Sequence, residues 1–159
     1  MKKNLTANSS LAKILVTSVC LSLFTCLTIP SLASDISLVT DSVKIKPSDD
    51  ESVLATTENF AIGMVGFVGH TSSGESAYRN ILKKSDAKLR FYEIFKSSDS
   101  TYAAKLYSAC GLKTLSSSKF KEVSQSLVAS KDQVTTMKAD VMRKEAVSEV
   151  MKRIDRFGC

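Results

Sequence analysis

Two cysteines constrain this chain more than any other feature of its sequence. Cys110 lies in the second half and Cys159 is the last residue, whereas Cys20 and Cys26 fall in an uncharged N-terminal stretch. If that stretch is a leader that is removed, two thiols remain, and two thiols in an exported chain most simply form one disulfide. The sequence therefore predicts a Cys110–Cys159 bond that ties the last helix to the middle of the fold. The alternative is an intermolecular bridge through Cys159.

The N-terminal third has the pattern of a secretory signal. Lysines without any acid precede an uncharged apolar run from Ile14 to Ile29, and Pro30 and "SLAS" follow it. This order predicts a signal peptide over residues 1–33, cleavage after Ala33, and a periplasmic or extracellular location. The run has about 16 residues, which is short for a membrane span of roughly 20. An uncleaved membrane anchor is the alternative.

Charge and residue counts exclude several classes of function. Removal of residues 1–33 takes three lysines and no acid, which lowers the net charge from +6 to +3. No dense basic tract interleaved with aromatics remains, so no nucleic-acid partner is predicted. His70 is the only histidine, and two cysteines in a disulfide cannot supply a zinc site. We therefore predict no metal, no cofactor, and no membrane contact after signal cleavage.

Residues 48–159 are predicted to form a single helical domain, preceded by a flexible segment over 34–47. Short serine-bearing turns separate segments whose apolar residues recur at helical spacing. Such short turns make neighbouring helices antiparallel. When the sequence is aligned with itself at an offset of 29 residues, apolar positions of two of these segments coincide. Such a repeat is expected of stacked helical hairpins. The expected fold is mainly α, with antiparallel helical hairpins forming a short HEAT-like α-solenoid or a bundle, closed by one disulfide.

Capping residues locate the helix boundaries. Four serines are expected to begin helices: Ser48, Ser72, Ser85 and Ser118. The first helix is expected to continue through Phe60 and Ala61, and Glu75 is expected to complete a capping box at the second. The last helix is expected over 145–157, with Phe157 closing its inward stripe and Gly158 ending it. Residues 132–142 lack helical periodicity and are predicted to be extended.

The stretch "GHTSSGES" raises the question of a serine nucleophile. A nucleophile elbow needs G-x-S-x-G after a strand, but the frame ending at Gly74 begins at His70. Ser72 is explained more simply as a helix cap, so no catalytic residue is predicted. A small serine hydrolase using Ser72 or Ser73 with His70 is kept as an alternative.

Three glycines precede this stretch at intervals of three: Gly63, Gly66 and Gly69. The spacing differs from that of a phosphate-binding P-loop, and no Lys-Ser/Thr pair follows. We expect these glycines to allow close helix packing or to end the first helix in a turn. A backbone site for a small anion near the start of the next helix is the alternative.

Residues 61–154 resemble a family of small exported bacterial proteins of unknown function. The motifs are G-x-x-S-x-G-E, then L-Y-x-x-C-G-L, then V-x-T-M. The residues that carry the resemblance are Gly66, Gly69, Ser73, Gly74, Glu75, Leu106, Tyr107, Cys110, Gly111, Leu112 and Met137. The resemblance implies structural rather than catalytic motifs. Where the family often has its second cysteine, this chain has Ala139 and Asp140, and it offers Cys159 instead.

These observations predict an exported, non-enzymatic binding module with a protein or peptide partner. A fainter resemblance implies an alternative, an accessory or immunity-type protein of a secreted antibacterial-peptide system. Neither the ligand nor the oligomeric state is predicted.

Overall fold

The computed structural model describes residues 48–159, so the predicted signal peptide (1–33) and the segment 34–47 lie outside the described residues. The described part is mostly helical, with six helices and small mixed sheets. In chain order the elements are α1 (Asp49–Thr56), β1 (Asn59–Phe60), β2 (Met64–Val65), β3 (His70–Thr71), α2 (Ser73–Leu82), α3 (Ala87–Lys96), α4 (Tyr102–Leu115), α5 (Ser117–Val128), β4 (Gln133–Lys138), β5 (Val141–Ala146) and α6 (Val147–Phe157). None of the described helices is long and apolar enough to cross a membrane.

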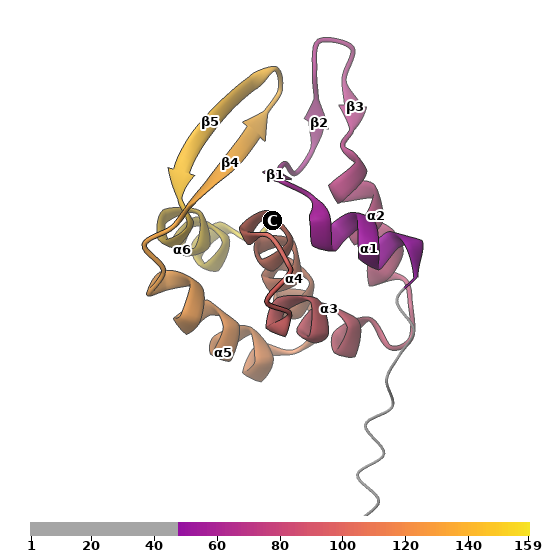
Figure 1. Cartoon of the computed structure of the whole chain (residues 1–159), viewed down its shortest axis with the longest axis vertical. Helices are drawn as coiled ribbons and strands as arrows, with labels where there is room; N and C mark the ends of the chain where they lie inside the picture. The colour runs from indigo at the N-terminus through magenta and orange to yellow at the C-terminus, as the bar shows by residue number, and fades with distance from the viewer. Residues whose placement is uncertain (1–47) are drawn as a thin grey trace, which may run out of the picture. The chain divides into compact units, whose positions relative to one another are not determined.

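Helix α4 is the centre of the helical packing (Figure 1). It contacts all five other described helices as well as β1 and β4. In a solenoid, each repeat contacts only its neighbours along the stack. The described residues thus confirm the mainly helical fold, but they do not show the expected HEAT-like solenoid.

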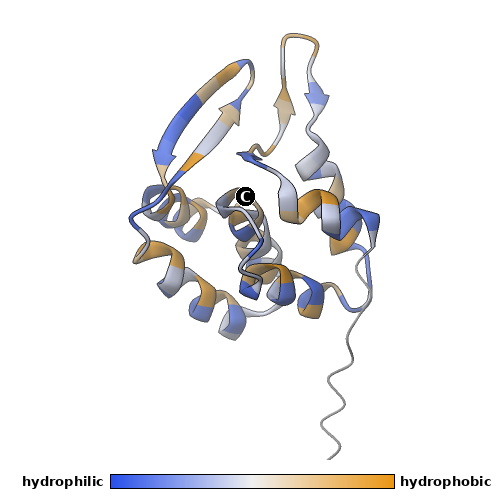
Figure 2. Cartoon of the chain, in the orientation of Figure 1, coloured by the Kyte–Doolittle hydropathy of each residue, from blue (hydrophilic) through white to orange (hydrophobic). Residues whose placement is uncertain are grey.

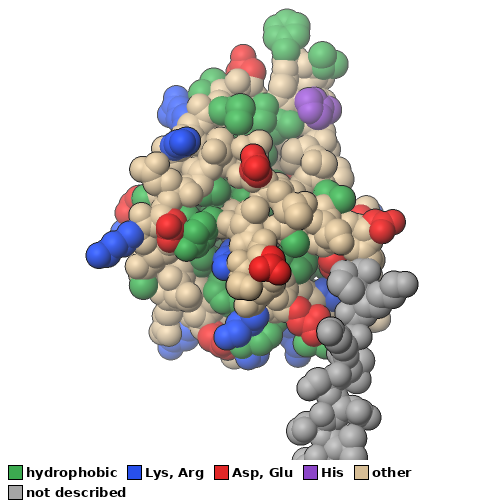
Figure 3. Space-filling model, in the orientation of Figure 1, with side chains coloured by type: hydrophobic (Ala, Val, Ile, Leu, Met, Phe, Trp, Pro, Cys, Tyr) green, Lys and Arg blue, Asp and Glu red, His purple; other side chains and the backbone are tan. Residues whose placement is uncertain are grey.

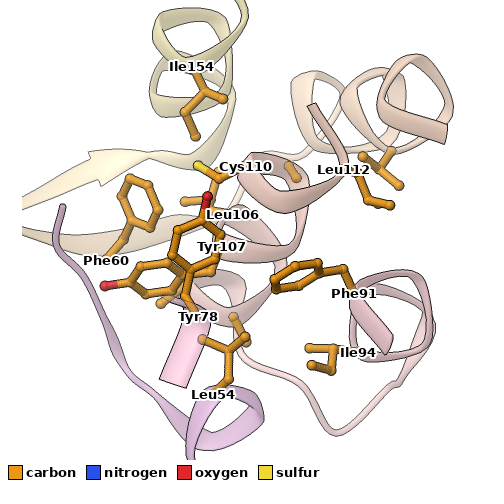
Figure 4. Packing of buried hydrophobic residues seen from close by; sticks show 14 of the residues in the cluster. Leu54, Phe60, Tyr78, Phe91, Ile94, Leu106, Tyr107, Cys110, Leu112 and Ile154 are labelled. Atoms are coloured by element: carbon orange, nitrogen blue, oxygen red, sulfur yellow. The ribbon is translucent and has the colours of Figure 1, made fainter. Parts of the chain in front are cut away.

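The core forms where the other elements meet α4. Figure 4 shows Leu54 of α1, Phe60 of β1, Tyr78 of α2 and Phe91 of α3 converging on Tyr107 and its neighbours in α4. Close packing of α3 depends on Gly111, because a Cβ at this position would overlap the Phe91 ring. A helix packed on most sides must be apolar around most of its circumference, as α4 is.

Two small sheets accompany the helices. In the first, the strand order is β1-β4-β5, with β1 parallel to β4 and β4 antiparallel to β5. The second is the β2–β3 hairpin. The extended conformation predicted for 132–142 is confirmed, but it continues through Ala146 and forms a hairpin. The last helix therefore begins at Val147 rather than at residue 145, since Glu145 and Ala146 pair with β4.

The first helix is shorter than predicted. It ends at Thr56, where the hydroxyls of Thr56 and Thr57 donate to the carbonyls of Ser52 and Val53 at 2.9 and 2.7 Å. Phe60 is not helical; it lies in β1 and packs its ring 4.8 Å from that of Tyr107. The prediction failed because Phe60 is buried by strand pairing rather than by continuation of the helical stripe.

Two of the four predicted serine caps are confirmed, and so is the glycine that ends the last helix. Ser48 and Ser72 are N-caps as predicted, whereas α3 begins after Asp86 rather than Ser85 and α5 begins after Ser116 rather than Ser118. Gly158 ends α6 with a φ of 85° and donates its N–H to the Ile154 carbonyl at 2.9 Å. Phe157, however, is 75% exposed, so its predicted place in the inward stripe is wrong.

The structure contains the predicted disulfide between Cys110 and Cys159. Their Cα atoms lie 5.9 Å apart, within the usual range for a bridged pair. Cys110 is buried in α4, and Cys159 directly follows the glycine that ends α6. The bond therefore fixes the end of α6 to the central helix.

Candidate interaction surface at the hairpin tips

The structure does not assemble the serine–histidine site that the sequence offered as an alternative. Ser72 Oγ accepts the Glu75 N–H at 3.2 Å and lies 3.5 Å from Tyr107 Oη, so it is engaged in the cap of α2. Ser73 is the first residue of α2. His70 lies exposed in β3, and within residues 48–159 no hydrogen bond joins it to either serine.

The three regularly spaced glycines shape the β2–β3 hairpin. Gly63, Gly66 and Gly69 have φ values of 96°, 74° and 68°, a left-handed conformation that only glycine adopts freely. The predicted turn at the end of the first helix is therefore wrong, because α1 already ends at Thr56 and the glycines form turns of the hairpin. The close-packing role belongs instead to Gly74, where a Cβ would lie 2.7 Å from Thr57 Cγ2, and to Gly111.

Exposed apolar side chains gather on this hairpin and on the neighbouring β4–β5 hairpin. We call them the tip cluster: Met64 (76% exposed), Phe67 (99%), Val68 (90%), Val141 (47%) and Met142 (55%). Figure 2 shows hydrophobic residues at the ends of both hairpins, and Figure 3 shows hydrophobic side chains projecting there. Full exposure of two consecutive apolar side chains, a phenylalanine and a valine, is unusual for a folded domain and makes the tip cluster a candidate interaction surface.

The two hairpins contact each other just below the tip cluster. Val65 of β2 is buried and forms a bridge with Ala139 in the turn between β4 and β5. The Gly66 N–H donates to the Ala139 carbonyl at 2.8 Å. Ala139 has a φ of 53°, which places its carbonyl within a tight turn. These contacts hold the two apolar tips side by side.

A buried polar network fixes the base of the β2–β3 hairpin. The Glu75 side chain is almost fully buried and accepts the Gly63 N–H at 2.9 Å, while Arg79 donates to it at 2.9 and 2.6 Å. Tyr107 Oη donates to the Ala61 carbonyl at 2.5 Å and accepts the Ala61 N–H at 3.0 Å. Burial raises the pKa of Tyr107, so it remains a neutral donor. Glu75 thus anchors the hairpin and does not close the predicted capping box.

Other candidate sites in the described residues are less developed. Within 48–159, no group of three His, Cys, Asp or Glu side chains is placed to hold a metal ion. Two open depressions of about 360 and 380 Å³ lie on either side of Tyr102. Asp132 and Lys105 line one, and Glu58 and Lys144 line the other. Neither depression involves the tip cluster.

Comparison with protein-family models, with curated proteins and with solved structures returned no match. The resemblance to small exported bacterial proteins therefore stays a prediction. The residues that carry it have clear structural roles here: Gly66 turns the hairpin, Gly74 and Gly111 allow close packing, and Glu75 and Tyr107 hold the base of the hairpin.

Sequence reasoning missed the tip cluster. Phe67 and Val68 belong to an apolar stretch, and apolar residues in a sequence are ordinarily assigned to the core. A signal was present in the flanking Gly66 and Gly69, since glycines around two residues indicate a turn that exposes them.

Proposed function

We propose that this protein is an exported, non-enzymatic interaction module that binds a protein partner through its tip cluster. The observation that carries the proposal is the exposure of Phe67 and Val68, 99% and 90%, on a hairpin whose base is fixed by buried hydrogen bonds. The partner surface that fits is an apolar pocket into which the Phe67 ring inserts.

Energetics support binding through these side chains. Burial of one Phe or Val side chain is worth about 1.5–3 kcal/mol. Ordering the loop would offset this gain, but two backbone hydrogen bonds, from Gly66 to Ala139 and from Gly69 to Gly66, already order part of it. An aromatic anchor at the centre of a small apolar surface is the usual arrangement of a binding hot spot.

One acidic residue at the tip favours a protein pocket over the hydrocarbon of a lipid bilayer. Asp140 lies in the turn of β4–β5, next to Val141 of the tip cluster. A carboxylate at this position is costly to bury in hydrocarbon. A protein pocket can supply a hydrogen-bond donor for Asp140 at its polar rim.

Two further observations support an exported, non-enzymatic module. The Cys110–Cys159 disulfide is typical of an oxidising compartment. Ser72 Oγ is engaged as the cap of α2, and His70 stands exposed on β3. A serine nucleophile needs a base within hydrogen-bond reach.

The test compares two variants of the purified protein. Phe67→Ser with Val68→Ser removes the anchor, whereas Phe157→Ser removes an equally aromatic, 75% exposed side chain outside the tip cluster. In affinity capture from extracellular or periplasmic extract, a specific partner should be retained by the wild type and by Phe157→Ser and lost by the double variant. Equal capture by all three proteins contradicts the proposal. If the wild type sediments with phosphatidylglycerol vesicles and the double variant does not, the tip cluster binds a lipid surface instead.

A further inference from the structure

Strand β5 forms an open edge of the three-stranded sheet. It pairs with β4 on one side over all six of its residues, Val141–Ala146, and no described strand pairs with its other side. The first four residues of β5 are exposed and the last two are half-buried. The opposite edge of the sheet is the two-residue strand β1. The longer edge, on β5, lies directly beside the tip cluster.

The backbone of β5 offers unused hydrogen-bonding groups along this edge. The Arg143 carbonyl faces β4, where it lies 3.4 Å from the hydroxyl oxygen of Thr136, the residue opposite. Backbone groups alternate in direction along a strand, so the N–H and C=O of Met142 and Lys144 point away from β4. Within residues 48–159 these groups have no hydrogen-bond partner. An edge in this state is a template for another strand.

The side chains of the edge are positively charged and unpaired. Arg143 and Lys144 are exposed, and neither forms an ion pair within the described part of the chain. The neighbouring Glu145 does not neutralise them, since it pairs with Arg153 and accepts a hydrogen bond from Thr136. Opposite charges directly across a strand pair stabilise it, and like charges destabilise it. The edge therefore selects an acidic strand.

We propose that β5 accepts an extended acidic segment of the partner as an added antiparallel strand. This inference rests on the proposed function and names the kind of segment that the partner contributes. Antiparallel addition places one acid opposite Lys144, the next opposite Arg143, and an apolar residue opposite Met142. The recognised sequence is acid–acid–apolar, read from N to C, and its apolar end extends toward the tip cluster.

The two cations disfavour pairing with β5 of a second copy when the two-fold axis lies at either of them. Two-fold antiparallel pairing centred on Arg143 or on Lys144 brings that residue opposite the same residue of the other copy. Such like-charge juxtaposition is how natural sheets keep their edges apart. The same cations that discourage self-pairing favour an acidic strand.

The test uses the intact, disulfide-bonded protein and a synthetic peptide, acetylated and amidated, of sequence Thr-Val-Glu-Glu-Leu-Val-Thr. In an NMR titration, the amide shifts should be confined to Val141–Ala146 and its neighbours on β4. A Lys-Lys-Leu version of the peptide should bind at least about tenfold more weakly, because both cross-strand pairs become repulsive. N-methylation of the first Glu and the Leu should abolish binding, since those two residues form the hydrogen bonds to Met142 and Lys144.

A charge exchange provides the decisive control. The Arg143→Glu, Lys144→Glu variant should lose the Glu-Glu-Leu peptide and gain the Lys-Lys-Leu peptide, a result that an unfolded variant cannot give. No shifts at millimolar peptide, or equal binding of the N-methylated peptide, overturns the inference. The Phe67→Ser, Val68→Ser variant should still bind the peptide. The experiment therefore tests strand addition at β5 separately from partner binding through the tip cluster.

Discussion

Loss of the Cys110–Cys159 bond should remove a large part of the stability of the domain. The substitution of choice is Cys159→Ser, because Cys159 is exposed while a hydroxyl at the buried Cys110 would add a desolvation cost. The bond joins residues 49 apart in sequence. In the chain-entropy model, closure of a loop of that length is worth about 4 kcal/mol. Small domains have a net stability of only about 5–15 kcal/mol.

Denaturant and thermal unfolding measure this loss. We expect Cys159→Ser to lower the free energy of unfolding by up to about 4 kcal/mol. For a domain of this size, the corresponding fall in melting temperature is roughly 15–20 °C. Reductant should lower the melting temperature of the wild type to that of the variant and leave the variant itself unchanged.

Two results would refute this reasoning. The first is an equal response of wild type and variant to reductant, which would mean that the bond contributes nothing. The second is a Cys159–Cys159 peptide in non-reducing peptide mapping, which would mean a covalent dimer. A Cys110–Cys159 peptide is the expected product.

Three further predictions concern the interior. Gly111→Ala should destabilise the domain by about 1–3 kcal/mol in urea unfolding, because the new Cβ overlaps the Phe91 ring; unchanged stability would refute this packing. Glu75→Gln should increase hydrogen exchange at the Gly63 amide while α4 stays protected, and uniform exchange would mean that Glu75 does not anchor the hairpin. Burial opposes ionisation of Glu51, yet its hydrogen bonds to an arginine and a serine outweigh burial and lower its pKa from the usual 4.5. The stability from Glu51 should therefore be present above pH ~4.5 and lost as pH falls through the lowered pKa, a decline that Glu51→Gln should flatten.

The helical part of the fold could be predicted from the sequence because its signal is local. Val147, Val150, Met151 and Ile154 recur at helical spacing, and all four are buried on one face of α6. The cap at Ser72 and the cysteine pair could also be predicted, since each depends on the chemistry of single residues.

The strands between residues 57 and 71 could not be predicted, because their structure depends on distant partners. β1, β2 and β3 have two residues each, too few to show an alternating pattern. Phe60 is extended because it pairs with β4, which lies more than 70 residues later in the chain. Glu75 has the spacing of a capping-box residue, and only the folded hairpin brings the Gly63 N–H to it.

Site-specific cross-linking tests the proposed interaction surface most directly. A photoreactive benzoylphenylalanine replaces Phe67 in one protein and Phe157 in a matched control, and both positions already hold an exposed phenylalanine. After irradiation in extracellular or periplasmic extract, position 67 should give a discrete cross-linked product with one partner protein and position 157 should give none. Identical product patterns from the two positions, or no product from position 67, would contradict the assignment of the tip cluster as the binding surface.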